Sequence, residues 1–202
     1  MIEIEPCSDS NGAHAEIDGK LNALVGLVIA DVKYWGIADS AVPVCTHHVG
    51  FDSVRTGVEL IFADFILGLR WKMEQFRVRS GVVNKHGISL LIDPDDGFLT
   101  TRSLVRQNTP LGSAWDSLIG QQIVEVAAGW HLPSEGAPQC LWTVRCSCVN
   151  GKSFTVSLGR SVETGQDDPT FAPDHLVVIF EQTLANRYRI PAGLQSAWGG
   201  SY

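Results

Sequence analysis

The stretch LWTVRCSCVNGKSFTVSL, residues 141–158, holds two apolar runs of strand length separated by a turn that contains Asn150-Gly151. Asn-Gly readily adopts the positive φ angles of a tight turn and is the strongest short-range hairpin signal. The flanking runs, Leu141 to Cys148 and Phe154 to Leu158, are rich in β-branched and aromatic residues. The stretch therefore predicts an antiparallel hairpin and favours a chain built mainly from β-strands.

A weak internal repeat extends this pattern. Residues 24–32, LVGLVIADV, align with residues 118–126, LIGQQIVEV, at four identical positions that include a glycine. In both copies a tryptophan, alternating apolar positions and a Leu-Gly pair follow, as expected for a helical turn that ends at glycine and leads into strands. The alternative is chance, because unrelated strands share Val, Ile and Leu. We expect two related β-rich halves, 1–107 and 113–202, which either stay separate or form one compact domain.

Several other segments have strand composition: 58–71 (one buried strand or a bent pair), 75–79, 88–92, 98–103 and 175–180. The sequence Asp93-Pro94-Asp95-Asp96-Gly97 has turn chemistry and predicts a hairpin between the third and fourth of these. A helix is expected at 181–188, ahead of Pro191. Residues 36–52 and 161–174 are expected to be long loops. The predicted fold class is α+β, mostly antiparallel β, with a few short helices.

Composition and charge indicate a soluble globular protein. Of the 202 residues 45% are hydrophobic and 18% charged, and the formal net charge is −7. This acidity argues against direct binding to nucleic acid, which needs clustered Lys and Arg. No apolar run approaches the length of a membrane-spanning helix, and the first ten residues lack the basic and apolar regions of a secretory signal. We therefore expect a cytoplasmic protein that does not bind membranes.

The segment Cys45-Thr46-His47-His48 is the strongest candidate for chemistry. Cys and His are zinc ligands, and a Cys-His pair can form an activated nucleophile. A structural zinc site needs a second ligand pair, and Cys146-Ser147-Cys148 has only one residue between its cysteines. The five cysteines form an odd set, which suggests reduced thiols, and buried core residues are the simpler interpretation of the second pair. The sequence predicts neither a metal nor a cofactor.

No catalytic motif is present. The chain lacks the Gly-x-Ser-x-Gly of serine hydrolases and both glycine-rich nucleotide-binding patterns. An enzyme remains possible on sequence grounds, because many catalytic sites leave no local signature, but a non-enzymatic role is favoured.

The predicted function is therefore that of a bacterial protein-binding protein. A small, acidic, β-rich chain without catalytic motifs fits an immunity protein that neutralises a basic toxin domain by occlusion. The candidate partner-binding residues are those of two acidic loops and one tryptophan: Asp93, Asp95, Asp96, Asp167, Asp168 and Trp71. The alternative is an enzyme or small-ligand binder with a site between the two halves, around Cys45, His47 and His48. The oligomeric state is left open.

Overall fold

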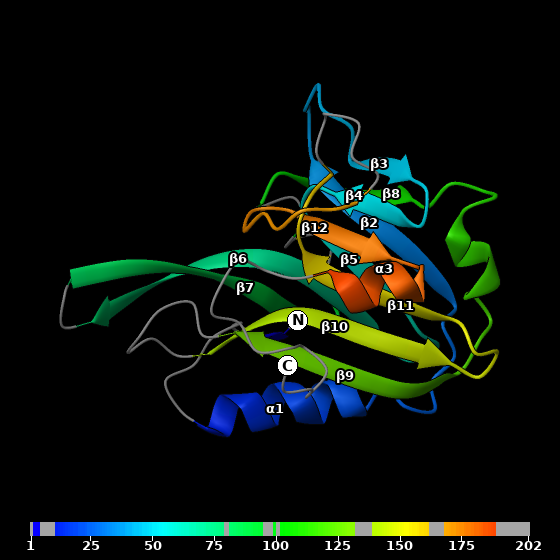
Figure 1. Ribbon diagram of the computed structural model, residues 1–202, viewed down its shortest axis with the longest axis horizontal. Helices are drawn as coiled ribbons and strands as arrows, with labels where there is room; N and C mark the ends of the chain where they lie inside the picture. The colour runs from blue at the N-terminus through cyan, green and yellow to red at the C-terminus, as the bar shows by residue number, and fades with distance from the viewer. Residues whose placement is uncertain are drawn as a thin grey trace.

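The computed structural model describes residues 2–4, 11–78, 81–94, 99, 102–131, 139–161 and 168–188. Two antiparallel sheets pack face to face, and the α-helices α1 and α3 lie outside them (Figure 1). The elements are β1 (Ile2–Ile4), α1 (Asn11–Asn22), β2 (Asp31–Ile37), β3 (Cys45–His48), β4 (Phe51–Val54), β5 (Gly57–Ile61), β6 (Ile66–Val78), β7 (Gly81–Ile92), β8 (Leu104–Asn108), a 3-10 helix η1 (Ala114–Ser117), β9 (Ile123–His131), β10 (Cys140–Cys148), β11 (Ser153–Leu158), β12 (Leu176–Ile179) and α3 (Gln182–Arg187). The mostly antiparallel β class is confirmed.

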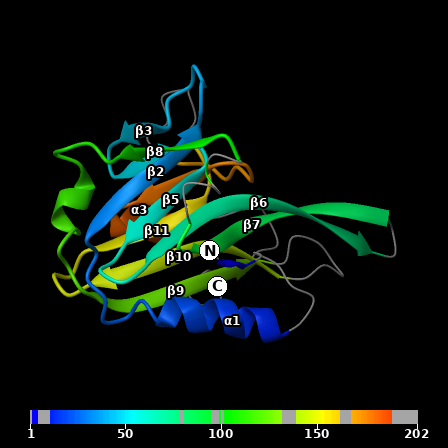
Figure 2. The same ribbon diagram turned by 180° about the vertical axis from the view of Figure 1, so that it is seen from behind.

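The second sheet contains a meander of four sequential strands, β9 to β12, and the first sheet contains the similar run β2-β5-β6-β7, in which β3 and β4 of the other sheet intervene between β2 and β5. The first sheet has the order β1-β7-β6-β5-β2-β8, and the second has the order β3-β4-β12-β11-β10-β9. The long ribbon β6–β7 extends beyond the rest of the first sheet, as the view from behind shows (Figure 2). The hairpin predicted from residues 141–158 is confirmed as β10–β11, with Gly151 at a positive φ of 77° in its turn. The expected bent pair at 58–71 forms β5 and the start of β6.

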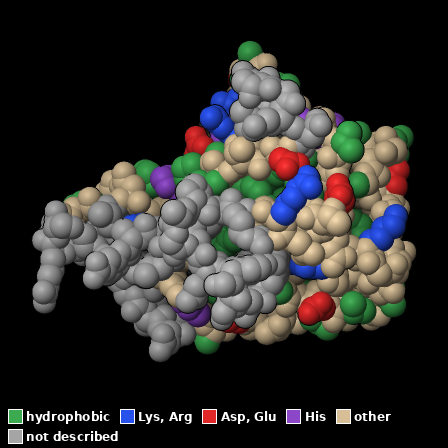
Figure 3. Space-filling model, viewed as in Figure 1, with side chains coloured by type: hydrophobic (Ala, Val, Ile, Leu, Met, Phe, Trp, Pro, Cys, Tyr) green, Lys and Arg blue, Asp and Glu red, His purple; other side chains and the backbone are tan. Residues whose placement is uncertain are grey.

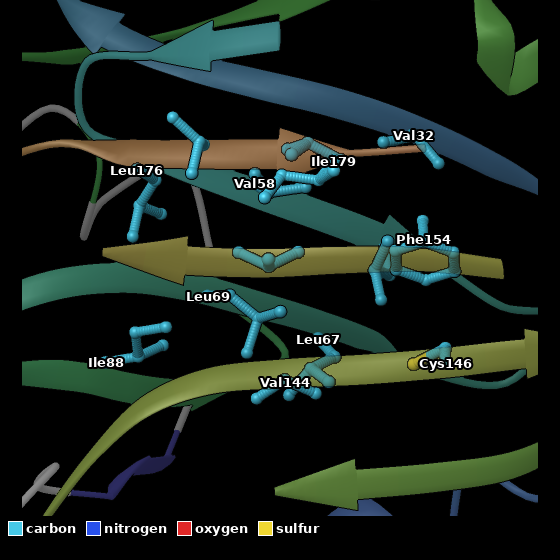
Figure 4. Packing of buried hydrophobic residues seen from close by; sticks show 14 of the residues in the cluster. Val32, Val58, Leu67, Leu69, Ile88, Val144, Cys146, Phe154, Leu176 and Ile179 are labelled. Carbon is cyan, nitrogen blue, oxygen red and sulfur yellow. The ribbon is translucent and has the colours of Figure 1, made fainter. Parts of the chain in front are cut away.

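The inner faces of the two sheets form one apolar core. Val58, Leu69 and Ile88 of the first sheet belong to the same buried cluster as Val144 and Leu176 of the second (Figure 4). Burying such side chains contributes about 1.5–3 kcal/mol each. Because this cluster draws on both predicted halves, their apolar faces are buried together.

The outer face of the first sheet holds a second, smaller core around Trp35. The indole lies against Gly57 and Gly68 of the neighbouring strands, where an added Cβ would approach ring atoms to 2.7 Å and 2.4 Å. Leu91 and Leu99 complete the buried cluster. The two glycines are therefore required by the close approach of the tryptophan ring.

The two aligned repeat segments lie side by side and bond to one another. The N–H of Gly26 donates to the carbonyl of Ile123 at 2.8 Å, and the N–H of Gly120 donates to the carbonyl of Ile29 at 2.8 Å. In the sequence alignment Gly26 corresponds to Gly120 and Ile29 to Ile123, so the two bonds are equivalent. Both glycines have positive φ angles, 94° and 80°, as expected for the residue that ends a helical turn.

Two expectations from the sequence are wrong. Residues 36–52 are not a long loop, because they contain β3 and the first residues of β4, which form a hairpin beside β12. The segment 98–103 is not the second strand of a hairpin with β7, since its described residues lie outside any strand. β7 pairs instead with β6 and β1, and β8 pairs with β2.

The cysteines differ from the expectation of five reduced thiols. Cys140 is disulfide-bonded. Cys45, Cys146 and Cys148 are free. Cys146 and Cys148 are buried in the core on β10, as the simpler interpretation of this pair predicts. Among the described residues, no helix is long and apolar enough to span a bilayer.

We expect the protein to lose stability between pH 7.5 and pH 5.5 because of His131. Burial lowers the pKa of this ring, an effect partly offset by its Nε2, which donates to the carbonyl of His86. The unfolded chain therefore binds the proton first, and stability falls as the pH drops through about 6.5, by at most about 1.4 kcal/mol per pH unit. Urea denaturation at both pH values measures this loss. If the His131→Gln variant loses as much stability between the two pH values, the loss comes from other titratable groups.

Candidate functional site

The candidate site is built on the short hairpin β3–β4. Gly50 has a positive φ of 82° in the turn between the two strands, a conformation that glycine adopts without steric cost. The register pairs Cys45 with Val54 and His47 with Asp52. Because side chains alternate along a strand and paired residues share a face, Cys45, His47 and Asp52 lie on the same face of the hairpin.

These three side chains form a compact cluster of potential ligand atoms. The Sγ of Cys45, a ring nitrogen of His47 and a carboxylate oxygen of Asp52 all lie within 4.8 Å of one another. The His47 Nδ1 is 2.7 Å from the Asp52 Oδ1 and 3.8 Å from the Cys45 Sγ. The Asp52 side chain is 7% exposed and that of His47 is 45% exposed. The cluster thus has a buried acidic end and an end that reaches solvent.

Two buried aromatic residues orient the Asp52 carboxylate through hydrogen bonds. The hydroxyl of Tyr34 donates to the Asp52 Oδ2 at 2.5 Å, and the indole N–H of Trp115 donates to the Tyr34 hydroxyl oxygen at 2.7 Å. Burial raises the pKa of Tyr34 well above its usual value, and Asp52 raises it further, so the phenol keeps the proton that it donates. Both carboxylate oxygens of Asp52 therefore have a fixed partner, Tyr34 on one side and His47 on the other.

A cavity of about 270 Å³ adjoins this cluster. It lies between the turn end of the β3–β4 hairpin, the chain segment that joins the two predicted halves, and the end of β12. Its lining residues are His47, His48, Gly50, Phe51, Asp52, Pro110, Leu111, Gly112, Ser113, Ala114 and Phe180. Of the residues named in the sequence-based alternative, His47 and His48 line this cavity and Cys45 does not.

Two residues that line the cavity, His48 and Ser113, each have a buried polar atom without a hydrogen-bond partner among the described residues: His48 Nε2 and Ser113 Oγ. Buried polar groups of this kind are normally satisfied, by protein, water or ligand. The His48 ring is held by stacking on Phe51, with ring centroids 4.5 Å apart. Two polar atoms beside the cavity therefore lack a hydrogen bond within the described part of the protein.

The geometry argues against a nucleophilic role for Cys45. In a catalytic triad the histidine uses one ring nitrogen for the acid and the other for the nucleophile. Here Cys45 and Asp52 both approach the same atom, Nδ1 of His47. Burial and, secondarily, Asp52 raise the pKa of the Cys45 thiol, so the free protein holds it in the protonated, poorly nucleophilic form.

The residues predicted to bind a partner do not gather at this cavity. Asp93 is exposed and accepts a hydrogen bond from the backbone N–H of Ile66 at 2.8 Å. Trp71 is half-buried against the core and donates its indole N–H to the carbonyl of Arg55. Asp168 forms an exposed ion pair of 2.6 Å with Arg187. The other three, Asp95, Asp96 and Asp167, lie outside the described residues.

Sequence analysis did not identify Asp52, Tyr34 or Ser113 as site residues. One signal for Asp52 was present: Val49-Gly50 can form a tight turn, which places Asp52 opposite His47. The chain matches no protein-family model, no curated protein and no solved structure. The site is therefore interpreted from its own geometry.

Proposed function

We propose that the protein is a small-ligand-binding protein whose site is the cavity between the β3–β4 hairpin and residues 110–114. The observation that carries this proposal is a cavity whose lining includes His48 and Ser113, each with a buried polar atom, Nε2 and Oγ, that has no hydrogen-bond partner among the described residues. A bound ligand with matching donors and acceptors would satisfy both atoms, and an unmade buried hydrogen bond costs about 1–3 kcal/mol.

The lining defines the class of ligand. Phe51, Phe180 and Pro110 supply apolar walls, whereas His47, His48 and Ser113 supply hydrogen-bonding groups. A volume of about 270 Å³ is below the range of about 300–1,000 Å³ that is usual for drug-sized ligands. The expected ligand is a small molecule with an apolar body and two or more polar groups.

A binding screen with two variants tests this proposal. The probes are amino acids, monosaccharides, nucleosides and short carboxylic acids, and binding is detected by ligand-observed NMR on the full chain. We expect at least one class to bind the wild type and to lose binding in Ser113→Ala and His48→Phe. Ser117→Ala is the matched control, because Ser117 lies on the same 3-10 helix but bonds to the carbonyl of Ala114. No binding by any class, or binding unchanged in both cavity variants, would refute the proposal.

A second candidate function is the binding of a basic protein partner by occlusion, as in an immunity protein. Two apolar side chains at the cavity favour it: Leu111 is 99% exposed, and Val49, between two lining residues, is 86% exposed. Exposed apolar side chains are common anchors of protein interfaces. The net charge of −7 would attract a basic partner, although acidic and basic side chains lie interspersed on the face in Figure 3.

A pull-down tests the second candidate. Wild-type protein should retain a stoichiometric partner that the Leu111→Asp variant loses, whereas Val149→Asp, at another exposed valine, should retain it. Retention by both variants would place the interface elsewhere, for example at the predicted Asp93, Asp168 and Trp71. Recovery of no partner by wild-type protein would count against this function.

We also propose that the two halves are related by duplication. The support is the correspondence between the strand orders β2-β5-β6-β7 and β9-β10-β11-β12, the first of which is interrupted in the sequence by β3 and β4, and the equivalent bonds at Gly26 and Gly120. The cytoplasmic location stays a prediction. The disulfide of Cys140 is more typical of an oxidising compartment than of the cytoplasm. The redox state of this cysteine in cells therefore tests the predicted location.

A further inference from the structure

The strongest feature outside the cavity itself is the set of three different donor atoms on one face of the β3–β4 hairpin. We propose that Cys45 Sγ, His47 Nδ1 and Asp52 Oδ1 bind a divalent transition-metal ion, preferentially Zn²⁺. Thiolate sulfur, imidazole nitrogen and carboxylate oxygen are the three ligand types of zinc sites. The site goes beyond the proposed uptake of a small molecule, because it involves different atoms and stands whether or not the cavity holds one.

The two donor separations that involve His47 fit a tetrahedral ion after small shifts. Zinc bond lengths of about 2.0–2.3 Å separate nitrogen and oxygen ligands by about 3.3 Å, and sulfur and nitrogen ligands by about 3.6 Å. In the structure the corresponding separations are 2.7 Å, for Asp52 Oδ1 to His47 Nδ1, and 3.8 Å, for Cys45 Sγ to the same nitrogen. The ion would take the place of the hydrogen bond between His47 and Asp52 and would push these two groups apart by about half an ångström.

The surroundings of Asp52 are those of an oriented metal ligand. Its second oxygen, Oδ2, accepts the hydrogen bond from Tyr34, whose hydroxyl is fixed in turn by Trp115. Outer contacts of this kind hold a ligand in position, and their loss typically weakens metal binding 10–100-fold. The first oxygen, Oδ1, points to the other two donors and is the atom left to bind an ion.

Three protein ligands leave one position of a tetrahedral ion for a further group. His47 and Asp52 both line the cavity, and the His47 side chain is 45% exposed. An ion between them would therefore have access to solvent or to a molecule in the cavity. This arrangement of three ligands and one open position differs from a closed structural zinc site.

Cobalt titration of the full chain tests the proposal. Co²⁺ added to chelator-treated protein should bind at one ion per chain and give a thiolate-to-cobalt charge-transfer band, which Zn²⁺ then abolishes by displacement. Cys45→Ser should lose the band, and His47→Ala should weaken Co²⁺ binding at least about 100-fold, more than loss of an outer contact would. The matched control is His175→Ala, because His175 and Asp174 form a similar pair, 3.0 Å apart, elsewhere.

Three outcomes would overturn the metal site: no charge-transfer band in the folded wild type, an unchanged band in Cys45→Ser, or an equal loss in His175→Ala. Circular dichroism of each variant shows whether it is folded. The small-ligand proposal is tested independently of the metal site. Ser113→Ala and His48→Phe alter the cavity without removing a donor of the cluster, so they should leave Co²⁺ binding unchanged.

Discussion

Replacing Glu59 by alanine should lower the free energy of unfolding by about 3–5 kcal/mol, the usual cost of removing one partner of a buried ion pair. Glu59 is 1% exposed. Its Oε2 accepts hydrogen bonds from the Trp35 indole N–H at 2.9 Å and from the Arg106 Nε at 2.8 Å. Alanine would remove the acceptor of both bonds while the indole and the guanidinium stay largely covered by the protein. Urea denaturation at pH 7 measures the change.

The size of this effect depends on burial, and a surface glutamate provides the control. Glu125 of β9 is exposed, and its recorded hydrogen bond, from Ser147, is 3.4 Å long. Glu125→Ala should therefore change stability by less than about 0.5 kcal/mol, as surface substitutions usually do. Glu59→Gln, which keeps a neutral acceptor of the same shape, should fall between the two. A loss below about 1 kcal/mol in Glu59→Ala would show that the ion pair contributes little.

The sequence predicted the strands whose signals are local. Asn150-Gly151 lies in the short turn, residues 149–152, between β10 and β11, where Gly151 has a positive φ of 77°, and this hairpin was identified correctly. β12 and α3 were also found within one or two residues of their ends, because an apolar run and a helical composition ahead of Pro191 mark them. Each of these signals lies within a few residues of the element that it predicts.

The sequence did not predict elements that depend on distant partners. β3 and β4 are four residues each and contain polar residues, so in the sequence they resemble a loop; they join the sheet through the pairing of β4 with the distant β12. β8 pairs with β2, about seventy residues earlier in the chain, rather than with the adjacent β7. Gly68 appeared only as part of a Leu-Gly repeat, whereas its role is to make room for the ring of Trp35. Such contacts between distant segments leave no local pattern.

The candidate site was found only in part for the same reason. Cys45, His47 and His48 are adjacent in sequence and stand out as chemically reactive types. Asp52 belongs to the opposite strand of a hairpin that was expected to be a loop, and Ser113 belongs to the junction between the halves. Three-dimensional pairing was needed to bring the five residues to one place.

Tyr34→Phe should lower the free energy of unfolding by about 2–5 kcal/mol. The hydroxyl is buried between a carboxylate and an indole, so its removal loses a hydrogen bond to a charged group and leaves the Trp115 N–H without its acceptor. Tyr188→Phe is the matched control, because its buried hydroxyl donates to the neutral carbonyl of Leu158 at the same length, 2.5 Å. The control should lose about 1 kcal/mol. Equal losses in the two variants would show that the carboxylate of Asp52 adds nothing.

The same substitution connects stability to function, because Tyr34 neither lines the cavity nor belongs to the three-donor cluster. Its hydroxyl is hydrogen-bonded to that cluster through the Oδ2 of Asp52. If Asp52 binds an ion through Oδ1, folded Tyr34→Phe should bind Co²⁺ about 10–100-fold more weakly than wild-type protein, whereas Tyr188→Phe should bind it normally. A Tyr34→Phe variant with wild-type affinity for Co²⁺ would mean that the hydroxyl stabilises the fold without orienting a metal ligand. Asp52 would then not need the hydrogen bond from Tyr34 to bind an ion.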